Sequence, residues 1–164
     1  MRDPMAEPYA LRVTLGAVRF APIVRIGGLD VGDRRIGVAI SDELGWTAQG
    51  LGVVERSGLA ADLEAIRRCF ADYAPTTIVV GLPKNMNGTL GPQAEKVSAF
   101  ARALETALAV PIVLWDERGS TLGAERVLLE ADLSRAKRRK VIDKAAAVFI
   151  LQGYLDRLAA DRRA

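Results

Sequence analysis

The sequence predicts an α/β domain built on a five-stranded mixed sheet, an antiparallel meander followed by parallel strands, with helices on both faces. One observation is a set of three short apolar runs joined by tight turns, which is typical of a meander. Another is that the later apolar runs alternate with segments of helical period, which is typical of parallel strands joined by crossover helices. At 164 residues, 50% hydrophobic and 5% aromatic, the chain suits one domain with an aliphatic core.

The predicted meander comes first in the domain. Its three strands are expected over residues 24–31, 36–42 and 47–54. Gly32 and Asp33 supply the tight turn between the first two strands, since both residue types favour turns. Residues 1–22 show no clear period, so we expect an N-terminal extension there and the domain itself over 23–160.

Helices and strands alternate through the rest of the predicted domain. Leu63, Ile66 and Phe70 recur at helical spacing, whereas Thr77 begins a continuous apolar run typical of a strand covered on both faces. Thr89 is the expected N-cap of the second helix. The expected order is a helix over 60–73, a strand over 77–81, a helix over 89–109, a strand over 111–116, and helices over 120–130 and 137–160.

The amino-acid composition limits the available chemistry. Histidine is absent and cysteine occurs once, which excludes Ser-His-Asp and Cys-His catalysis, histidine-ligated zinc and a disulfide framework within this chain. Carboxylates remain as catalytic groups, and their hard oxygens suit Mg²⁺ or Mn²⁺. Cys69 lies among apolar residues and is interpreted as a core residue. The alternative is an exposed thiol that cross-links two chains.

Hydropathy and charge indicate the expected location of the chain and the class of its partner. No apolar run approaches the roughly 20 residues of a membrane span, and charged residues interrupt the N-terminal apolar patches. We therefore expect no membrane partner, no secretory signal and a cytoplasmic location. The formal net charge is only +3, but the cations are concentrated in one segment, which favours a polyanionic partner such as nucleic acid.

Acidic residues occur at three places where carboxylates are costly to bury. Asp30 lies inside the first apolar strand, Asp143 lies beside the apolar stripe of the last helix, and Asp116 and Glu117 end the fifth strand. Asp116 and Glu117 must point to opposite faces of an extended strand, and we favour Glu117 because of its longer reach. Clustered carboxylates repel one another unless a cation lies between them, so the pattern favours a divalent metal held by Asp30, Glu117 and Asp143.

Each acid alone also has a structural interpretation. Asp30 could begin a turn or pair with a buried Arg or Lys, Asp116 could pair with Arg118, and Asp143 could stabilise a helix N-terminus. It is the combination of a strand, a strand end and a helix face that favours a shared site.

Two further segments are candidates for nucleic-acid binding. The Gly- and Asn-rich loop after the fourth strand carries Lys84, Asn85 and Asn87, which are suitable donors to phosphate, and its alternative interpretation is a plain turn. The basic segment before Asp143 suits a polyanion, and its alternative interpretation is a solvated helix face. Its cations are Arg135, Lys137, Arg138, Arg139, Lys140 and Lys144.

Four motifs in order carry a resemblance to a known family. They read GLDVGDRRIGVAISD, IVVGLPKNMNGT, DERGST and IDKAAAVFILQGYLD, and the resemblance that they carry covers residues 24–156. The chain resembles the YqgF family, also called RuvX, of ribonuclease H-like nucleases. The resemblance implies Asp30, Glu117 and Asp143 as the acidic active site. It implies the loop, Arg118 and the basic segment as the nucleic-acid surface. Lys84 and Asn87 depart from the family's usual Leu and Asp, and Gly119 replaces its usual Leu.

The resemblance also implies a function. We expect a metal-dependent endonuclease in which Asp30 bridges two ions about 4 Å apart and Glu117 and Asp143 complete their coordination. The expected role is processing of the 5′ end of pre-16S rRNA, and the alternative is resolution of four-way Holliday junctions in DNA. A homodimer is left open, since symmetric junction cutting requires two sites.

Rival functions of another class are a non-catalytic nucleic-acid-binding scaffold and an actin-like or sugar-kinase-like ATPase. The ATPase would share the Asp-x-Gly hairpin but needs a second similar half, for which we expect no room here.

Overall fold

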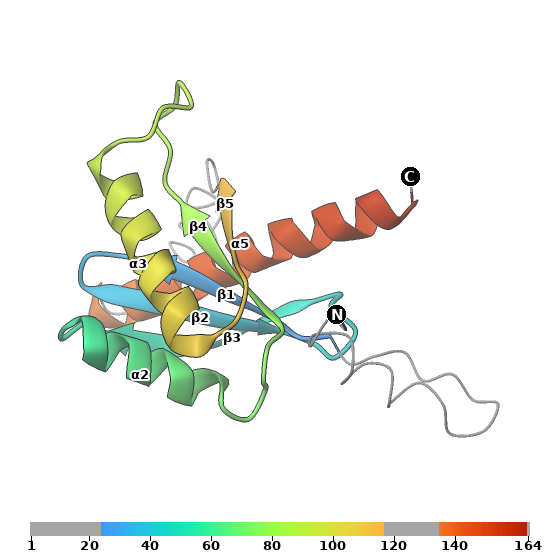
Figure 1. The fold of residues 1–164 in the computed structure, drawn as a ribbon, viewed down its shortest axis with the longest axis horizontal. Helices are drawn as coiled ribbons and strands as arrows, with labels where there is room; N and C mark the ends of the chain where they lie inside the picture. The colour runs from blue at the N-terminus through green and yellow to red at the C-terminus, as the bar shows by residue number, and fades with distance from the viewer. Residues whose placement is uncertain (1–23, 117–134, 164) are drawn as a thin grey trace, which may run out of the picture.

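The computed structural model describes residues 24–116 and 135–163, and the predicted extension over 1–22 and the predicted helix over 120–130 lie outside them. Five strands form one sheet in the order β3-β2-β1-β4-β5 (Figure 1). The described elements are β1 (Ile26–Val31), β2 (Arg35–Ser41), β3 (Ala48–Glu55), α2 (Leu59–Phe70), β4 (Thr77–Leu82), α3 (Pro92–Leu108), β5 (Ile112–Asp116) and α5 (Arg135–Arg163). The predicted fold class is confirmed.

Strand directions follow the expected pattern of a meander and then parallel strands. β1 pairs antiparallel with β2, and β2 with β3, whereas β4 lies parallel to both β1 and β5. The carboxyl ends of β1, β4 and β5 therefore lie together at one end of the sheet. Open α/β folds place their ligands at the carboxyl ends of the strands.

Two apolar cores lie on the two faces of the sheet, with α2 and α3 on one face and α5 across the other (Figure 1). Along β1, Leu29 and Val31 belong to the core under α2 and α3, whereas Ile26 belongs to the core under α5. Alternation along the strand consequently assigns Gly28 and Asp30 to the α5 face.

Glycines let α5 lie close against the centre of the sheet. A Cβ at Gly37 on β2 would overlap the main-chain carbonyl of Asp143, and a Cβ at Gly28 on β1 would come within 2.7 Å of the Leu151 Cβ. Ala147 of α5 is fully buried and its atoms lie beside both glycine positions, so small residues line both sides of the contact. This close approach brings the backbone of Asp143 against β2, the strand beside the one that carries Asp30.

The start of α3 differs from the prediction. Its N-cap is Gly91 and Pro92 occupies the first turn, whereas Thr89 was the expected cap. Pro is favoured at this position because its missing N–H would have no helical partner. Thr89 instead donates and accepts hydrogen bonds within the preceding loop. No helix in the described parts of the chain is both long enough and apolar enough to cross a bilayer.

Candidate active site

Asp30 is half-buried in the central strand of the sheet, on the face that α5 covers. Its partner in the antiparallel register is Gly37, so no side chain on β2 lies directly beside it. Burial, and after it the negative charge of Asp143, raise the pKa of Asp30 from 3.8 to about 6. A cation bound at this carboxylate would remove both penalties.

Asp143 reaches the same region from α5 and is held there by Arg35. The Arg35 Nε donates a 2.6 Å hydrogen bond to Asp143 Oδ2, and only 24% of the Asp143 side chain is exposed. Among the described residues, no cation forms an ion pair with Asp30. Arg35 is half-buried and neutralises Asp143, so the described residues supply no buried Arg or Lys partner for Asp30.

Arg35 is the residue of this site that the sequence analysis missed. Arg35, Gly37 and Ala39 alternate along β2, and Ala39 is buried under α5, so Arg35 belongs to the same face. That alternation was readable, but the partner lies 108 residues away on α5.

The end of β5 bears on the choice between Asp116 and Glu117. Val113 and Trp115 contact the core under α5, whereas Ile112 contacts the core on the other face. In the parallel register Asp116 lies opposite Leu82, which also belongs to the α2 and α3 core. Asp116 therefore lies on the face opposite Asp30. Glu117 and its neighbour Arg118 lie outside the described residues.

The donor chemistry of the site fits a divalent metal. Carboxylate oxygens are the hard ligands that Mg²⁺ and Mn²⁺ prefer, and two of the three predicted acids, Asp30 and Asp143, approach one another here. Within residues 24–116 and 135–163, no group of three or more His, Cys, Asp or Glu side chains could hold a metal. The third predicted ligand is Glu117, so the described part supplies a partial ligand set.

The loop between β4 and α3 projects beyond the carboxyl end of β4 (Figure 1). Its two asparagine side chains bond within the loop, with Asn85 Nδ2 donating to Thr89 Oγ1 at 2.9 Å and Asn87 Oδ1 accepting from the Thr89 hydroxyl at 2.6 Å. Lys84 forms an antiparallel bridge with Leu90. Both asparagines thus shape the loop, and nucleic-acid contact by Lys84, Asn85 and Asn87 stays a prediction.

The predicted basic segment forms the first turns of α5, with five of its cations before Asp143 and Lys144 directly after it. Its exposed members are Arg135, Lys137, Arg139, Lys140 and Lys144, whereas Arg138 is half-buried. Lys144 crosses Gly50 on β3, where a Cβ would meet its side chain. The cations therefore extend from the acidic site toward the β3 edge of the sheet.

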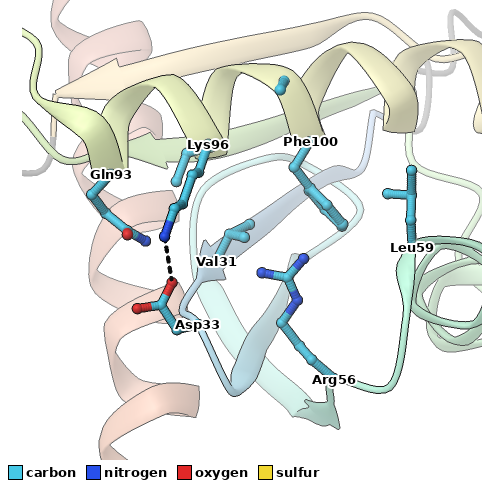
Figure 2. A pocket seen from close by; sticks show the side chains of 9 residues that line it. Val31, Asp33, Arg56, Leu59, Gln93, Lys96 and Phe100 are labelled. Atoms are coloured by element: carbon cyan, nitrogen blue, oxygen red, sulfur yellow. Dashed lines mark ion pairs between the residues drawn. The ribbon is translucent and has the colours of Figure 1, made fainter.

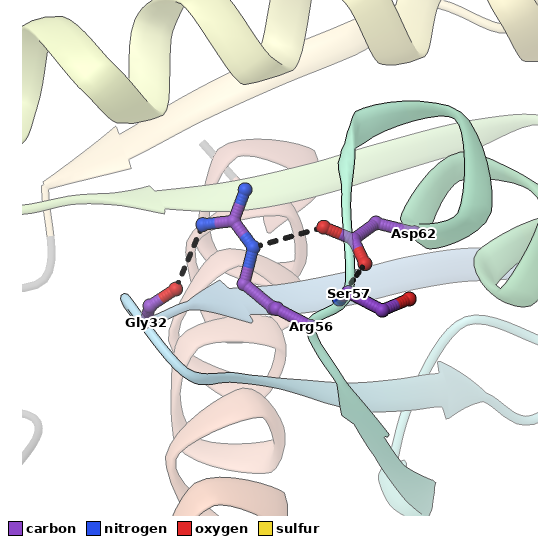
Figure 3. A network of polar contacts seen from close by, with 4 residues as sticks. All are labelled: Gly32, Arg56, Ser57 and Asp62. Carbon is purple, nitrogen blue, oxygen red and sulfur yellow. Dashed lines mark hydrogen bonds and ion pairs between the residues drawn. The ribbon is translucent and has the colours of Figure 1, made fainter.

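A polar network on the other face supports the turn between β1 and β2 (Figure 3). Arg56 donates from Nη1 to the Gly32 carbonyl at 2.9 Å and from Nε to Asp62 at 3.1 Å. Asp62 is 2% exposed and accepts a further bond from the Ser57 N–H. Although burial acts to raise the pKa of Asp62, these hydrogen bonds and the Arg56 charge lower it overall. The network secures the turn that follows Asp30.

Cys69 is half-buried and packs against the core under α2 and α3. Burial raises the pKa of its thiol. Its interpretation as a core residue is therefore favoured over a cross-linking thiol.

The sheet order, the meander and the helix across its acidic face define a ribonuclease H-like fold, which solved resolvases share. The T. thermophilus RuvC structure in complex with a Holliday junction substrate matches with a TM-score of 0.53 and 20% identity, over 83% of this chain and 96% of that one. The Fowlpox virus resolvase with its junction DNA matches with a TM-score of 0.53 and 14% identity, over 82% and 99%.

Sequence comparison identifies the family. The family model described as "RuvX: Holliday junction resolvase" matches residues 24–157. A Moorella thermoacetica protein named "Putative pre-16S rRNA nuclease" is 61% identical over 135 residues, 82% of this chain and 96% of that protein. A Clostridium tetani protein of the same name is 58% identical, over 81% and 96%. The chain belongs to the RuvX family of nucleases, as its four motifs indicated.

Proposed function

We propose that this chain is a metal-dependent endonuclease that cuts structured nucleic acid, with the 5′ end of pre-16S rRNA as its substrate. The observation that carries the proposal is the Asp30 carboxylate, which is half-buried, faces Asp143 and has no cationic partner among the described residues. The names of the relatives at 58–61% identity support the substrate.

The proposed ligands of the metal are Asp30, Glu117 and Asp143. Bound there, Mg²⁺ or Mn²⁺ would lower the pKa of a water and stabilise the departing oxygen of the phosphodiester. Arg35 holds Asp143 in place through its 2.6 Å hydrogen bond. Glu117 is preferred to Asp116 because Asp116 lies on the opposite face of the sheet.

Binding of the nucleic acid is assigned to the basic turns of α5, Arg118 and the loop after β4. Lysine and arginine bind phosphates without reading bases, so we expect affinity that depends on salt and recognition by shape. The position of the exposed cations, in the turns of α5 that precede Asp143, supports this assignment.

Holliday-junction resolution is the second candidate. It is favoured by the description of the matching family and by the two resolvases whose structures include junctions. The non-catalytic scaffold is the third, and metal-dependent cleavage is the observation that separates it from both.

Substitution of Asp30 by Asn tests the proposal. We expect Asp30→Asn to lower metal-dependent cleavage by about 10²–10³-fold or more, because a charge-stabilising group is lost while the shape is kept. Cleavage of a pre-16S rRNA leader and of a four-way DNA junction is measured with Mg²⁺, with Mn²⁺ and after chelation.

Asp116→Asn is the matched control and should cleave like the wild type. The melting temperature of Asp30→Asn should not fall, because burial already disfavours the charged form of this side chain. Full activity of Asp30→Asn, or of the chelated enzyme, would contradict the metal assignment. Loss of activity in Asp116→Asn would reverse the choice between the two neighbouring acids.

A further inference from the structure

A cavity of about 340 Å³ lies on the face of the sheet opposite Asp30 (Figure 2). It is bounded by the end of β1, the turn after β1, the chain from β3 into α2, and the first turns of α3. Its size is within the range of about 300–1,000 Å³ that is usual for small-molecule sites. The residues that line it are Val31, Asp33, Arg56, Leu59, Gln93, Lys96, Val97, Ala99 and Phe100.

The cavity combines an apolar wall with polar groups at its mouth. Val31, Val97 and Phe100 are buried members of the core, and they form the apolar wall. Lys96 and Gln93 point from α3 toward the turn after β1 (Figure 2). Lys96 meets Asp33 at 4.0 Å, and their side chains are 69% and 70% exposed, so this contact is weak and easily exchanged.

Arg56 gives the cavity a cation of fixed orientation. Its Nε and Nη1 donate to Asp62 and to the Gly32 carbonyl (Figure 3). Its guanidinium lies over the Phe100 ring, 5.1 Å from the ring centroid (Figure 2). Nη2 takes part in neither hydrogen bond. Phe100 is only 4% exposed and the guanidinium covers its ring, so the surface on which a nucleobase can stack is the guanidinium plane backed by that ring.

We propose that this cavity binds one nucleotide of a single-stranded segment of the substrate. The base lies against the Phe100 and Arg56 wall, and the phosphate binds Lys96 and Gln93 in place of Asp33. Val31, which lines the cavity, directly follows Asp30 in β1. A nucleic-acid strand that crosses the turn after β1 therefore reaches both the cavity and the acidic site. The proposal rests on the proposed nuclease function, since it assigns a part of that substrate.

A titration locates the ligand directly. Amide resonances of the full chain are followed by NMR while adenosine 5′-monophosphate, adenosine or inorganic phosphate is added to about 10 mM, which detects millimolar binding. We expect the nucleotide to shift Val31, Val97 and Ala99 more than either fragment does. Shifts confined to other residues, or equal shifts with phosphate alone, would overturn the nucleotide site.

Matched variants on α3 test the use of the cavity by nucleic acid. Lys96→Gln should weaken binding of a single-stranded RNA oligonucleotide about tenfold and reduce the slope of log K against log salt by about 0.7. Arg102→Gln makes the same charge change on an exposed position of the same helix and should alter neither value. Ala99→Leu fills the cavity from its exposed rim with a good helix former and should weaken binding about tenfold.

The outcomes separate this site from the nuclease proposal. Wild-type affinity in both Lys96→Gln and Ala99→Leu would overturn the cavity assignment, whether or not the chain cleaves. Loss of binding in these two variants would support the cavity even if no cleavage were found, because binding is measured without metal or turnover.

Discussion

At the scale of single residues, two carboxylates of the candidate site differ in their partners. Asp143 is neutralised by Arg35, whereas Asp30 is half-buried near Asp143 and its pKa rises to about 6. A carboxylate in that condition favours binding of either a proton or a metal ion. The arrangement therefore directs a bound cation to Asp30 more than to Asp143.

Asp62 is expected to stabilise the fold through its charge. Asp62→Asn should lower the free energy of unfolding at pH 7 by about 1–3 kcal/mol, because Arg56 loses its buried counterion. The folded-state pKa of Asp62 is lowered, so its contribution is complete above the unfolded pKa near 3.9 and is lost as the pH falls through the folded value. Urea unfolding at pH 7 and at about pH 3 measures the difference.

The control for this prediction is Asp72→Asn, which removes an exposed carboxylate just after α2. It should change stability by less than about 0.5 kcal/mol. The difference in the free energy of unfolding between the wild type and Asp62→Asn should shrink on acidification. A gap that stays constant between the two pH values would contradict a stabilising charge at Asp62.

At the scale of elements, the packing of α5 against the sheet positions the acidic site. The helix approaches β2 so closely at Gly37 that its own backbone occupies the space of a side chain. Packed interiors transmit such displacements, because they contain little free volume. Any residue that moves α5 outward also moves Asp143 away from Asp30.

Gly37→Ala is expected to destabilise the fold by about 3 kcal/mol, the upper end for overpacking, because the added Cβ meets a main-chain carbonyl. The melting temperature should fall by about 6–12 °C. Gly52→Ala on the neighbouring strand is the control, since nothing lies within 4 Å of its Cβ position, and it should melt within about 2 °C of the wild type. Equal melting temperatures for the two variants would show that α5 is not tightly packed at Gly37.

The basic turns of α5 are expected to bind phosphates. Neutralising Arg139 and Lys140 together should reduce the slope of log K against log salt by about 1.4–1.8, as expected for two lost contacts. Arg162 and Arg163, two exposed cations at the other end of the same helix, give a control of equal charge change. The affinity of each double variant for a labelled RNA is measured from low to moderate salt. If both double variants gave the same slope of log K against log salt, the basic turns would be only a solvated helix face.

At the scale of the whole molecule, the sheet separates two surfaces that carry different groups of residues. The face under α5 carries the acidic residues and borders the basic turns, whereas the face under α2 and α3 carries the cavity. A single acidic site cuts one strand at a time, so trimming of an RNA end requires one copy. Symmetric cutting of a four-way junction requires two copies related by a two-fold axis.

Junction cutting is therefore expected to depend on a homodimer, and RNA processing to persist in the monomer. Mass in solution is measured by analytical ultracentrifugation under the conditions of both cleavage assays. Cys69→Ala should leave the mass unchanged, because Cys69 is half-buried and packs against the core under α2 and α3. Paired, symmetric cuts made by a strictly monomeric preparation would contradict this prediction.

The sequence by itself determined the kinds of elements, their order and the sheet they form. Period-two and helical patterns act over a few residues, so the meander and the helices α2, α3 and α5 were readable without tertiary information. Asp30 and Asp143 were also readable, because carboxylates inside apolar patterns are costly wherever the chain folds. The four motifs also identified the family without tertiary information, since each is a short stretch of sequence and they occur in a fixed order.

Tertiary structure decided the partners of those residues. Arg35 pairs with Asp143 rather than with Asp30, and Asp116 lies away from the acidic face. Both facts depend on strand register and on the position of α5, which no local pattern contains. The cavity likewise gathers residues from β1, the β3-to-α2 connection and α3, which become neighbours only when the helices close over the sheet. Burial of apolar surface drives that closure, and it is a property of the whole chain.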